Sequence, residues 1–282
     1  MRYSFRGLLC LSTALVLIAG SMTAQAGPLM DRINSGKPIR IGFANLEPWA
    51  YEGNGQKPLG FVVAITLGVL GKMGYDRIEP ITSSWSGLIP GLNANRFDII
   101  TSAMFITKRR CKELAFSEPI GVFGDAFIVA KGNPKSLNNY QNLRNKNGMF
   151  VTGVGYDTIE TAINEGVPAS RIMRVPGPTE ILEAIKSGHA DAGGVTYFTA
   201  IHLAKESGGL VDVTEPTDLP KSTLNWVGIG FRNSDRDFLV KFNTALKKYI
   251  GSDEMMAVVT KYGYSESQLP GDQKTSWVCA NR

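Results

Sequence analysis

The fold class is decided by residues 149–195, which read MFVTGVGYDTIETAINEGVPASRIMRVPGPTEILEAIKSGHADAGGV. Three short and mostly apolar runs, at 149–154, 172–175 and 190–195, have the length of strands and alternate with two amphipathic stretches of helical periodicity. Strands that alternate with helices form mostly parallel sheets covered by helices. The segment therefore predicts an α/β fold.

Helix signals occupy the gaps between the strands. A helix is predicted over residues 235–250, because Ser234 can cap its start and Gly251 follows its end. Pro178 is preorganised for the first position of a second helix, which should run to Gly188. Further strands are expected at 39–44, 78–82, 97–102, 126–130 and 227–231.

Two breaks in this pattern indicate two lobes. The stretch Lys131-Gly132-Asn133-Pro134 is polar and rich in turn residues, and residues 216–222 form a second such stretch. A segment bounded by two breaks is expected to be a lobe inserted into another, with a hinge of two crossings. The predicted lobes are 27–130 together with 223–282 (lobe 1) and 131–222 (lobe 2).

Residues 1–26 have the features of a secretion signal. Arg2 and Arg6 precede an apolar run, and Ala24-Gln25-Ala26 is a small-residue cleavage site. Cys10 lies inside the apolar run and is not placed to carry a lipid anchor. We expect a free periplasmic protein, whose net charge falls from +5 to +3 when the leader and its two arginines are removed. No later segment has the roughly 20 apolar residues of a bilayer-spanning helix.

The mature chain keeps Cys111 and Cys279. In an oxidising compartment they can form a disulfide that ties the C-terminal tail to the first lobe, and the alternative is two free thiols. A catalytic thiol or a metal site is disfavoured, since His189 and His202 are 13 positions apart and lie in no nucleophile or ligand motif. The modest charge argues against nucleic-acid binding, and we expect a monomer without cofactor or metal.

Residues 101–119 read TSAMFITKRRCKELAFSEP and carry a family resemblance. A strand that ends in small polar residues is followed by Thr107 and Arg110 in a T-x-x-R segment, and then by Phe116-Ser117-Glu118-Pro119. These parts resemble the polar amino-acid family of periplasmic binding proteins, family 3, as does Lys261-Tyr262-Gly263 near the end of the chain. The resemblance implies a type II fold, with two lobes that each contain a mostly parallel sheet flanked by helices.

By this resemblance Arg110 is the clamp for the carboxylate of a small ligand. A guanidinium can bond both oxygens of a carboxylate, which suits that role. The alternative is that Lys108, Arg109, Arg110 and Lys112 form an ordinary solvated basic face.

The second lobe is expected to offer a helix start to the same carboxylate. In Gly153-Val154-Gly155-Tyr156-Asp157-Thr158, either Asp157 or Thr158 can cap a helix, with Glu160 placed to close a capping box. Backbone N–H groups at a helix start favour an anion, so the backbone of Asp157 and Thr158 is predicted to contact the ligand. A dinucleotide loop is disfavoured, because Thr158 replaces the third glycine of G-x-G-x-x-G.

The positive end of the ligand lacks its usual acidic partner. Members of the family that bind α-amino acids carry an acid after the strand written here as 190–195, and this chain has Thr196 there. Trp49, Trp85 and Phe105 each follow a predicted strand, at the strand ends where open α/β sheets bind ligands. Three rings can form a cage for a diffuse cation, and the alternative for each ring is an ordinary core position.

The three rings and the arginine resemble a narrower group, the ectoine- and hydroxyectoine-binding proteins. Other shared features are Ile89-Pro90-Gly91-Leu92, Arg110-Cys111, Glu165-Gly166-Val167-Pro168 and a cysteine near the C-terminus. Ectoine is a zwitterion whose positive charge is spread over a cyclic amidinium, which fits a cage of rings better than a single carboxylate. Members of this group have an acidic residue directly after the position of Asn45, where this chain has Leu46. Glu47 follows one position later and is a further candidate to bind a nitrogen of the ligand.

The resemblance implies the substrate-binding component of an ABC transporter, with a membrane permease as partner and ectoine or hydroxyectoine as ligand. A polar or cationic amino acid or a betaine is the alternative ligand. The alternative of another class is a periplasmic cyclohexadienyl or arogenate dehydratase, which the same fold hosts. Such an enzyme needs a general acid in the cleft. Thr196 stands at the position of that acid, so we expect no enzymatic activity.

Overall fold

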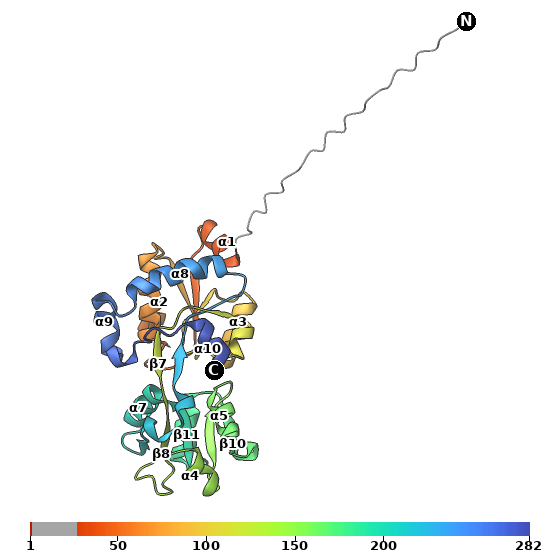
Figure 1. The fold of residues 1–282 in the computed structure, drawn as a ribbon. Helices are drawn as coiled ribbons and strands as arrows, with labels where there is room; N and C mark the ends of the chain where they lie inside the picture. Colours follow the sequence, from red (N-terminus) through yellow and green to blue (C-terminus); the bar gives the residue numbers. More distant parts are fainter. Residues whose placement is uncertain (2–26) are drawn as a thin grey trace.

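The computed structural model describes Met1 and residues 27–282, so residues 2–26 of the predicted secretion signal lie outside the described residues. Two α/β lobes, each with a five-stranded sheet, are joined by two crossings of the chain (Figure 1). This is the predicted two-lobe architecture. Among residues 27–282, no helix has both the length and the apolar character needed to cross a membrane.

The sheet of lobe 1 has the strand order β4-β1-β5-β14-β6. β1 (Ile39–Phe43) lies parallel to β4 (Ile78–Thr82) and β5 (Ile99–Ile100). β14 (Gly230–Phe231) runs antiparallel to β5 and to β6 (Ala115–Phe116). The segments that follow β1, β4 and β5 all reach the second lobe, so this edge of the sheet is where a site is expected.

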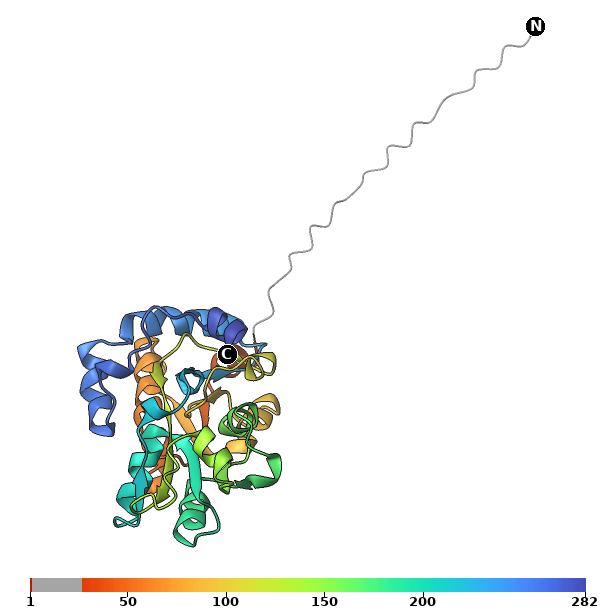
Figure 2. The same ribbon diagram turned by 60° about the horizontal axis from the view of Figure 1, so that its bottom comes forward.

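The C-terminal helices of lobe 1 pack on α2 (Phe61–Lys72), which is apolar around most of its surface. α8 (Arg236–Tyr249) and α9 (Asp253–Val259) lie against it, so that residues far apart in the sequence are side by side in both views (Figures 1 and 2). The remaining helices of this lobe are α1 (Pro28–Asn34), α3 (Leu88–Asn93) and α10 (Thr275–Asn281).

The sheet of lobe 2 has the order β10-β9-β11-β8-β12. β9 (Phe150–Gly153) is parallel to β10 (Ile172–Val175) and β11 (Ala192–Thr196), as residues 149–195 predict. β8 (Asp125–Ala130) is antiparallel to β11 and to β12 (Val211–Val213). The helices of this lobe are α4 (Tyr140–Asn145), α5 (Thr158–Asn164), α6 (Pro178–Lys186) and α7 (Tyr197–Glu206).

The two crossings are β7 (Gly121–Phe123) and β13 (Asn225–Val227), which pair antiparallel between the lobes. The predicted boundary between residues 130 and 131 is therefore wrong, since β8 belongs to the sheet of lobe 2 and that lobe begins near Gly124. The second predicted boundary, between 222 and 223, lies next to β13. The strand predicted at 227–231 is split, because it ends β13 and then forms β14 in the sheet of lobe 1.

The polar stretch that suggested the wrong boundary is a turn inside lobe 2. Lys131 Nζ and the backbone N–H of Gly132 donate to the two carboxylate oxygens of Asp212 on β12, at 2.7 and 2.8 Å. Turn residues mark the end of a strand whether or not the domain changes there. Such residues alone therefore could not place the hinge.

Two predicted helix caps are wrong. Asp235, and not Ser234, precedes α8, and its side chain makes no capping bond. The carboxylate of Asp235 instead accepts from the backbone N–H of Leu29 at 2.9 Å and pairs with Arg232 at 2.7 Å. Asp157 precedes α5 but its side chain likewise makes no capping bond, and no capping box forms there.

A disulfide joins Cys111 to Cys279 across 168 positions of the sequence. It ties α10 to the segment that follows Thr107, as the oxidised alternative predicted. The tail is also held by hydrogen bonds, since the hydroxyl of Thr275 donates to the carbonyl of Ser117 at 2.6 Å.

Asp98 is the centre of a buried charge cluster in lobe 1. Arg40 on β1 donates to both carboxylate oxygens of Asp98, at 3.1 and 2.8 Å, and Arg232 donates at 3.1 Å. Burial alone would raise the pKa of Asp98. The hydrogen bonds from Arg40 and Arg232 and the charge of Arg40 outweigh that effect, so its pKa lies below the ordinary value.

Asp98→Asn is expected to lower the free energy of unfolding by about 3 kcal/mol, because it leaves Arg40 largely buried without a carboxylate, whereas Arg232 keeps Asp235. The pKa of Asp98 is lower in the folded than in the unfolded chain. Its stabilising effect is therefore complete above the unfolded pKa of about 3.9 and is lost as the pH falls through the folded pKa. Urea unfolding near neutral pH and in acid should show the gap between wild type and variant closing in acid.

The matched control for Asp98→Asn is Glu254→Gln, which removes an exposed ion pair with Lys72 in the same lobe. Exposed pairs contribute about 0–1 kcal/mol. An equal loss of stability in the two variants would contradict the assignment of a stabilising role to the Asp98 cluster.

Candidate functional site

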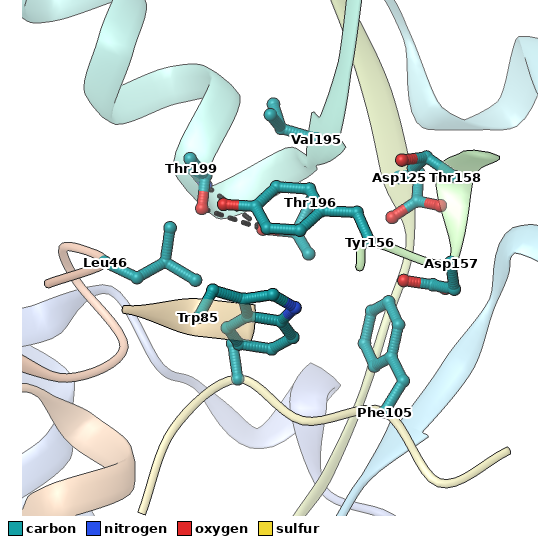
Figure 3. A pocket seen from close by; sticks show the side chains of 11 residues that line it. Leu46, Trp85, Phe105, Asp125, Tyr156, Asp157, Thr158, Val195, Thr196 and Thr199 are labelled. Atoms are coloured by element: carbon teal, nitrogen blue, oxygen red, sulfur yellow. Dashed lines mark hydrogen bonds between the residues drawn. The ribbon is translucent and has the colours of Figure 1, made fainter. Parts of the chain in front are cut away.

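A small cavity lies between the lobes, at the strand ends that meet there (Figure 3). Its volume is about 20 Å³, close to the roughly 10–15 Å³ that one water molecule needs. A ligand of the size of an amino acid therefore requires the lobes or the lining side chains to move apart. The lining residues are Leu46, Trp85, Ala103 and Phe105 of lobe 1 and Asp125, Tyr156, Asp157, Thr158, Val195, Thr196 and Thr199 of lobe 2.

Aromatic side chains from both lobes line the cavity. Trp85 begins the short helix after β4, and Phe105 follows β5, so both stand where the sequence placed them. Tyr156 of lobe 2 completes the set, and its ring centroid lies 5.4 Å from that of Trp85 with the planes at 76°. Figure 3 shows these two rings next to each other in the middle of the site. A ligand that enters must part them.

Trp49 is not a wall of the cavity, contrary to the prediction. Its side chain is fully buried, and its ring packs against Phe61 and Phe123 at centroid distances of 4.7 and 4.5 Å. The turn after β1 places Leu46 at the cavity and Trp49 in the core beside α2. Trp49 still contacts the site from behind, since its Nε1 donates to Oγ1 of Thr199 at 3.2 Å.

Arg110 lies beside the cavity and is only 2 % exposed. Its guanidinium donates to the carbonyl of Phe105 at 2.9 Å and, across the cleft, to the carbonyl of Gly155 at 3.2 Å. Its central carbon lies 5.6 Å from the centroid of the Trp85 ring. Within residues 27–282 the guanidinium forms no ion pair with a carboxylate. Arg110 is thus a buried cation whose protein partners are neutral carbonyls.

The environment of Arg110 differs from that of its neighbour Arg109. Burial lowers the pKa of Arg110, and the nearby charge of Asp157 opposes this effect. Arg109 has a side chain that is 55 % exposed and lies 3.8 Å from Glu113. The alternative of a solvated basic face therefore describes Arg109 and not Arg110.

Gly155 forms the lobe 2 side of this contact. Its φ of +80° lies in the left-handed region, which glycine adopts without strain. This turn directs its carbonyl to lobe 1, where it accepts from Arg110 and from Nε1 of Trp85, each at 3.2 Å. Two donors of lobe 1 therefore converge on one oxygen atom of lobe 2.

Asp157 and Thr158 line the cavity, as the sequence predicted. The hydroxyl of Thr158 is bonded to that of Thr152 at 2.5 Å, inside lobe 2. Burial raises the pKa of the Asp157 carboxyl, and the charge of Arg110 limits the rise. The contact of their backbone with a carboxylate stays a prediction.

Thr196 ends β11 at the cavity, where its Oγ1 accepts from the backbone N–H of Thr199 at 3.4 Å and so caps α7. Asp125, the first residue of β8, is its partner in the antiparallel pair of strands. Asp125 lines the cavity and is 1 % exposed. Asp125 could not be identified from the sequence, because this residue directly precedes an apolar run whose pattern indicates only a core strand.

Glu47 does not line the cavity. Its carboxylate lies 3.7 Å from Nε2 of His202 on α7, in a groove on the outer side of the lobe contact. The side chain of Leu46 occupies the place at the cavity, so the next side chain is directed elsewhere. This geometry does not support the predicted contact of Glu47 with a ligand nitrogen.

The lobes also meet through aromatic packing next to the cavity. Phe198 on α7 of lobe 2 lies against Trp49 and Phe61 of lobe 1, with centroid distances of 6.0 and 5.9 Å. It also contacts Phe123 of the crossing strand at 5.4 Å. This packing places lobe 2 against lobe 1 on the side of the hinge strand.

The sequence matches the bacterial extracellular solute-binding proteins, family 3, over residues 39–265, which span both lobes. The chain belongs to this family. The resemblance inferred from the Arg110 segment and the two-lobe type II fold are thereby confirmed.

Several relatives of this family 3 protein cover nearly its whole length. A probable amino-acid ABC transporter periplasmic-binding protein, y4tE of Sinorhizobium fredii, is 29 % identical over 96 % of this chain and 92 % of its own. The L-cystine-binding protein TcyJ of Escherichia coli is 22 % identical over 88 % of this chain and 92 % of its own. These relatives are transport-associated binding proteins.

Solved structures of related proteins share the fold. EhuB in complex with hydroxyectoine superposes with a TM-score of 0.81 and 25 % identity, covering 90 % of this chain and 98 % of EhuB. The ancestral amino-acid-binding protein AncCDT-1, a precursor of cyclohexadienyl dehydratase, gives a TM-score of 0.71 at 24 % identity, covering 84 % and 99 %. The family 3 chain is thus a solute-binding component of an ABC transporter for amino acids or related solutes, which acts outside the cytoplasm with permease components.

Proposed function

We propose that this binding component captures ectoine or hydroxyectoine. The observation that carries the proposal is the buried guanidinium of Arg110, which lies beside the ring of Trp85 and has no carboxylate partner among residues 27–282. A buried charge is costly unless an opposite charge or strong hydrogen bonds compensate it. The site is therefore suited to receive the carboxylate of a ligand.

The carboxylate would find its donors already directed at one point. Arg110 and Trp85 both donate to the carbonyl of Gly155. A carboxylate is a stronger acceptor than a carbonyl, because its hydrogen bonds are charge-assisted. In the proposed complex the carboxylate takes the place of that carbonyl oxygen, and the backbone N–H groups of Asp157 and Thr158 complete its binding.

The positive end of the ligand would lie among aromatic rings. Trp85, Phe105 and Tyr156 line the cavity, and their faces attract a diffuse cation. A cyclic amidinium spreads its charge over a flat surface and suits such rings. The 25 % identical EhuB binds hydroxyectoine, which supports the same ligand class for this chain.

Binding would close the lobes. The ligand first meets Arg110, Trp85 and Phe105 on lobe 1, and lobe 2 then brings Tyr156 and Gly155 over it. The packing of Phe198 stabilises the closed form, which the permease recognises. We also propose that residues 1–26 direct the protein to the periplasm and are removed there.

Calorimetric titration of the purified protein tests the ligand. The panel comprises ectoine, hydroxyectoine, glycine betaine, proline, arginine and cystine. Ectoine or hydroxyectoine is expected to bind with the highest affinity. Tight binding of an ordinary amino acid, with no binding of ectoine or hydroxyectoine, would overturn the proposed ligand but leave the assignment as a solute-binding component intact.

A dehydratase is the second candidate function, and the buried acid Asp125 in the cavity is the observation that favours it. Such an acid could protonate a leaving hydroxyl group. The same panel is therefore extended to prephenate and arogenate, with product formation followed by absorbance. We expect no turnover. Measurable turnover would show that the protein is an enzyme and would contradict the proposed binding function.

Trp85→Leu is expected to weaken binding of the zwitterion by about 5- to 30-fold. Leucine keeps apolar bulk but removes the ring face and the indole donor, and a desolvated cation–ring contact is worth about 1–2 kcal/mol. Titration of the variant measures the change. The control is Trp277→Leu, which replaces an exposed tryptophan of α10. Equal affinities for the Trp85 and Trp277 variants would contradict a role for Trp85 in the site.

A further inference from the structure

We propose that Asp125 is the residue that pairs with the positively charged end of the ligand. This inference rests on the proposed function and extends it, since it assigns a charged partner from lobe 2 to the cation. Asp125 is the first residue of β8, shortly after the hinge strand β7, and it lines the cavity between the lobes (Figure 3). A cage made of aromatic rings alone would not need this carboxylate.

The carboxylate of Asp125 has no partner within the part of the chain that the structure describes. It is 1 % exposed, and neither of its oxygens makes a hydrogen bond with residues 27–282. Buried charges in proteins are normally paired or hydrogen-bonded, because an isolated carboxylate loses its hydration without compensation. An unpaired acid that borders a cavity is therefore suited to a ligand.

The position of Asp125 explains how the chain compensates for having Thr196 where related amino-acid-binding proteins have an acidic residue. Thr196 and Asp125 are direct partners in the antiparallel pair of β11 and β8. Side chains of directly paired residues lie on the same face of a sheet, with Cβ atoms about 4.5–5.5 Å apart. The negative charge is thus moved to the neighbouring strand while it keeps its place at the cavity.

The ionisation of Asp125 is consistent with a cationic partner. Burial raises the pKa of its carboxyl well above the ordinary value, and the charge of Asp157 raises it further. The charge of Asp125 also contributes to the raised pKa of Tyr140 on α4, after burial, and the charge of Arg110 limits the rise in the pKa of Asp157. A cation that contacts Asp125 favours its charged form and lowers its pKa, so binding should release protons at pH values between the pKa of the complex and the raised pKa of the free protein.

The chemistry points to one ligand class. Arg110 suits a carboxylate and Asp125 suits a cation, so the two residues together favour a compact zwitterion. The described residues contain no cluster of His, Cys, Asp and Glu that could hold a metal ion. The rings of Trp85, Phe105 and Tyr156 at the same cavity suit an organic cation.

The test compares Asp125→Asn with wild type for two ligands, hydroxyectoine and cyclohexanecarboxylate, a ring acid without the cation. Calorimetry should show a loss of roughly 10- to 100-fold for hydroxyectoine and no loss for cyclohexanecarboxylate. The control is Asp212→Asn on the neighbouring strand β12, which should match wild type. Thermal unfolding shows that each variant is folded.

Two further measurements separate a contact with ligand from a structural role. Titration in two buffers of different ionisation enthalpy should show proton release by wild type and none by Asp125→Asn. The double variant Asp125→Asn with Thr196→Asp should recover affinity for hydroxyectoine, since it restores an acid on the paired strand and aspartate also caps helices.

The outcomes are distinct. Unchanged affinity of Asp125→Asn for hydroxyectoine would overturn the proposal and leave the proposed function intact. An equal loss for both ligands would assign Asp125 a structural role and also overturn it. If wild type binds no zwitterion of the panel, the proposed function fails, and the pairing of Asp125 with a ligand cation fails with it.

Discussion

Arg110→Gln is expected to lower the affinity for the zwitterion by at least about 30-fold. Removal of one partner from a buried, hydrogen-bonded charge pair costs about 2–5 kcal/mol, which corresponds to about 30-fold at the lower limit. Glutamine retains one amide donor but neither the charge nor the planar fork of donors. Calorimetry on the purified variant measures the loss.

The chain offers a matched control for this variant. Arg109→Gln removes the neighbouring arginine, whose side chain is 55 % exposed and pairs only loosely with Glu113 at 3.8 Å. This variant should bind within about twofold of wild type, because exposed pairs are worth little. Arg110→Lys keeps the charge and should give an intermediate affinity, since an ammonium cannot form two parallel bonds. If Arg110→Gln bound as Arg109→Gln does, the clamp would be refuted.

The structure also predicts an effect of Arg110 on the closed form. Its bond to the carbonyl of Gly155 is one of the contacts that join the lobes. The indole N–H of Trp85 donates a hydrogen bond to the same carbonyl. A ligand carboxylate would therefore exchange one contact between the lobes for another, and closure depends on which acceptor these donors prefer.

Trp85 and Phe105 could be placed from the sequence by topology, because each follows a strand of lobe 1 and the carboxyl ends of parallel strands meet at one edge of a sheet. The strands of residues 149–195 and the position of Thr196 could be predicted for the same reason. Local pattern and strand direction were sufficient for these parts. Arg110 was predicted from the family resemblance of residues 101–119.

Trp49, Glu47 and Asp125 could not be placed in the same way. Trp49 and Leu46 belong to one turn, and only the packing of that turn on α2 decides which of them faces the cavity. Asp125 is brought to the site by the pairing of β8 with β11, two strands separated by most of lobe 2. Long-range strand pairing leaves no local signal in an apolar run.

The hinge was misplaced for a related reason. β8 has the composition of a core strand, and nothing in it indicates which of the two sheets it joins. Its antiparallel contacts with β11 and β12 assign it to lobe 2. The polar turn at Lys131 was the stronger local signal, but it marks the far end of that strand.

The disulfide is expected to contribute strongly to the free energy of unfolding and little to the affinity for the ligand. Cys111→Ser with Cys279→Ser should lower the free energy of unfolding by about 4–5 kcal/mol. A cross-link between residues 168 positions apart restricts the unfolded chain strongly, and the chain-entropy model gives about this value for a long loop. Urea unfolding of wild type and of the double variant measures the difference.

The affinity of that double variant should stay within about threefold of wild type, although Cys111 is the neighbour of Arg110. The tail is also held by the bonds of Thr275 to Ser117 and Glu118, at 2.6 and 3.1 Å, and these remain when the sulfurs are removed. Because the cross-link acts on the unfolded chain, the folded site should keep its geometry. Reductant should destabilise wild type alone, and an effect of reductant on the double variant would point to a cause other than this bond. A large loss of affinity would instead show that the disulfide itself positions the guanidinium.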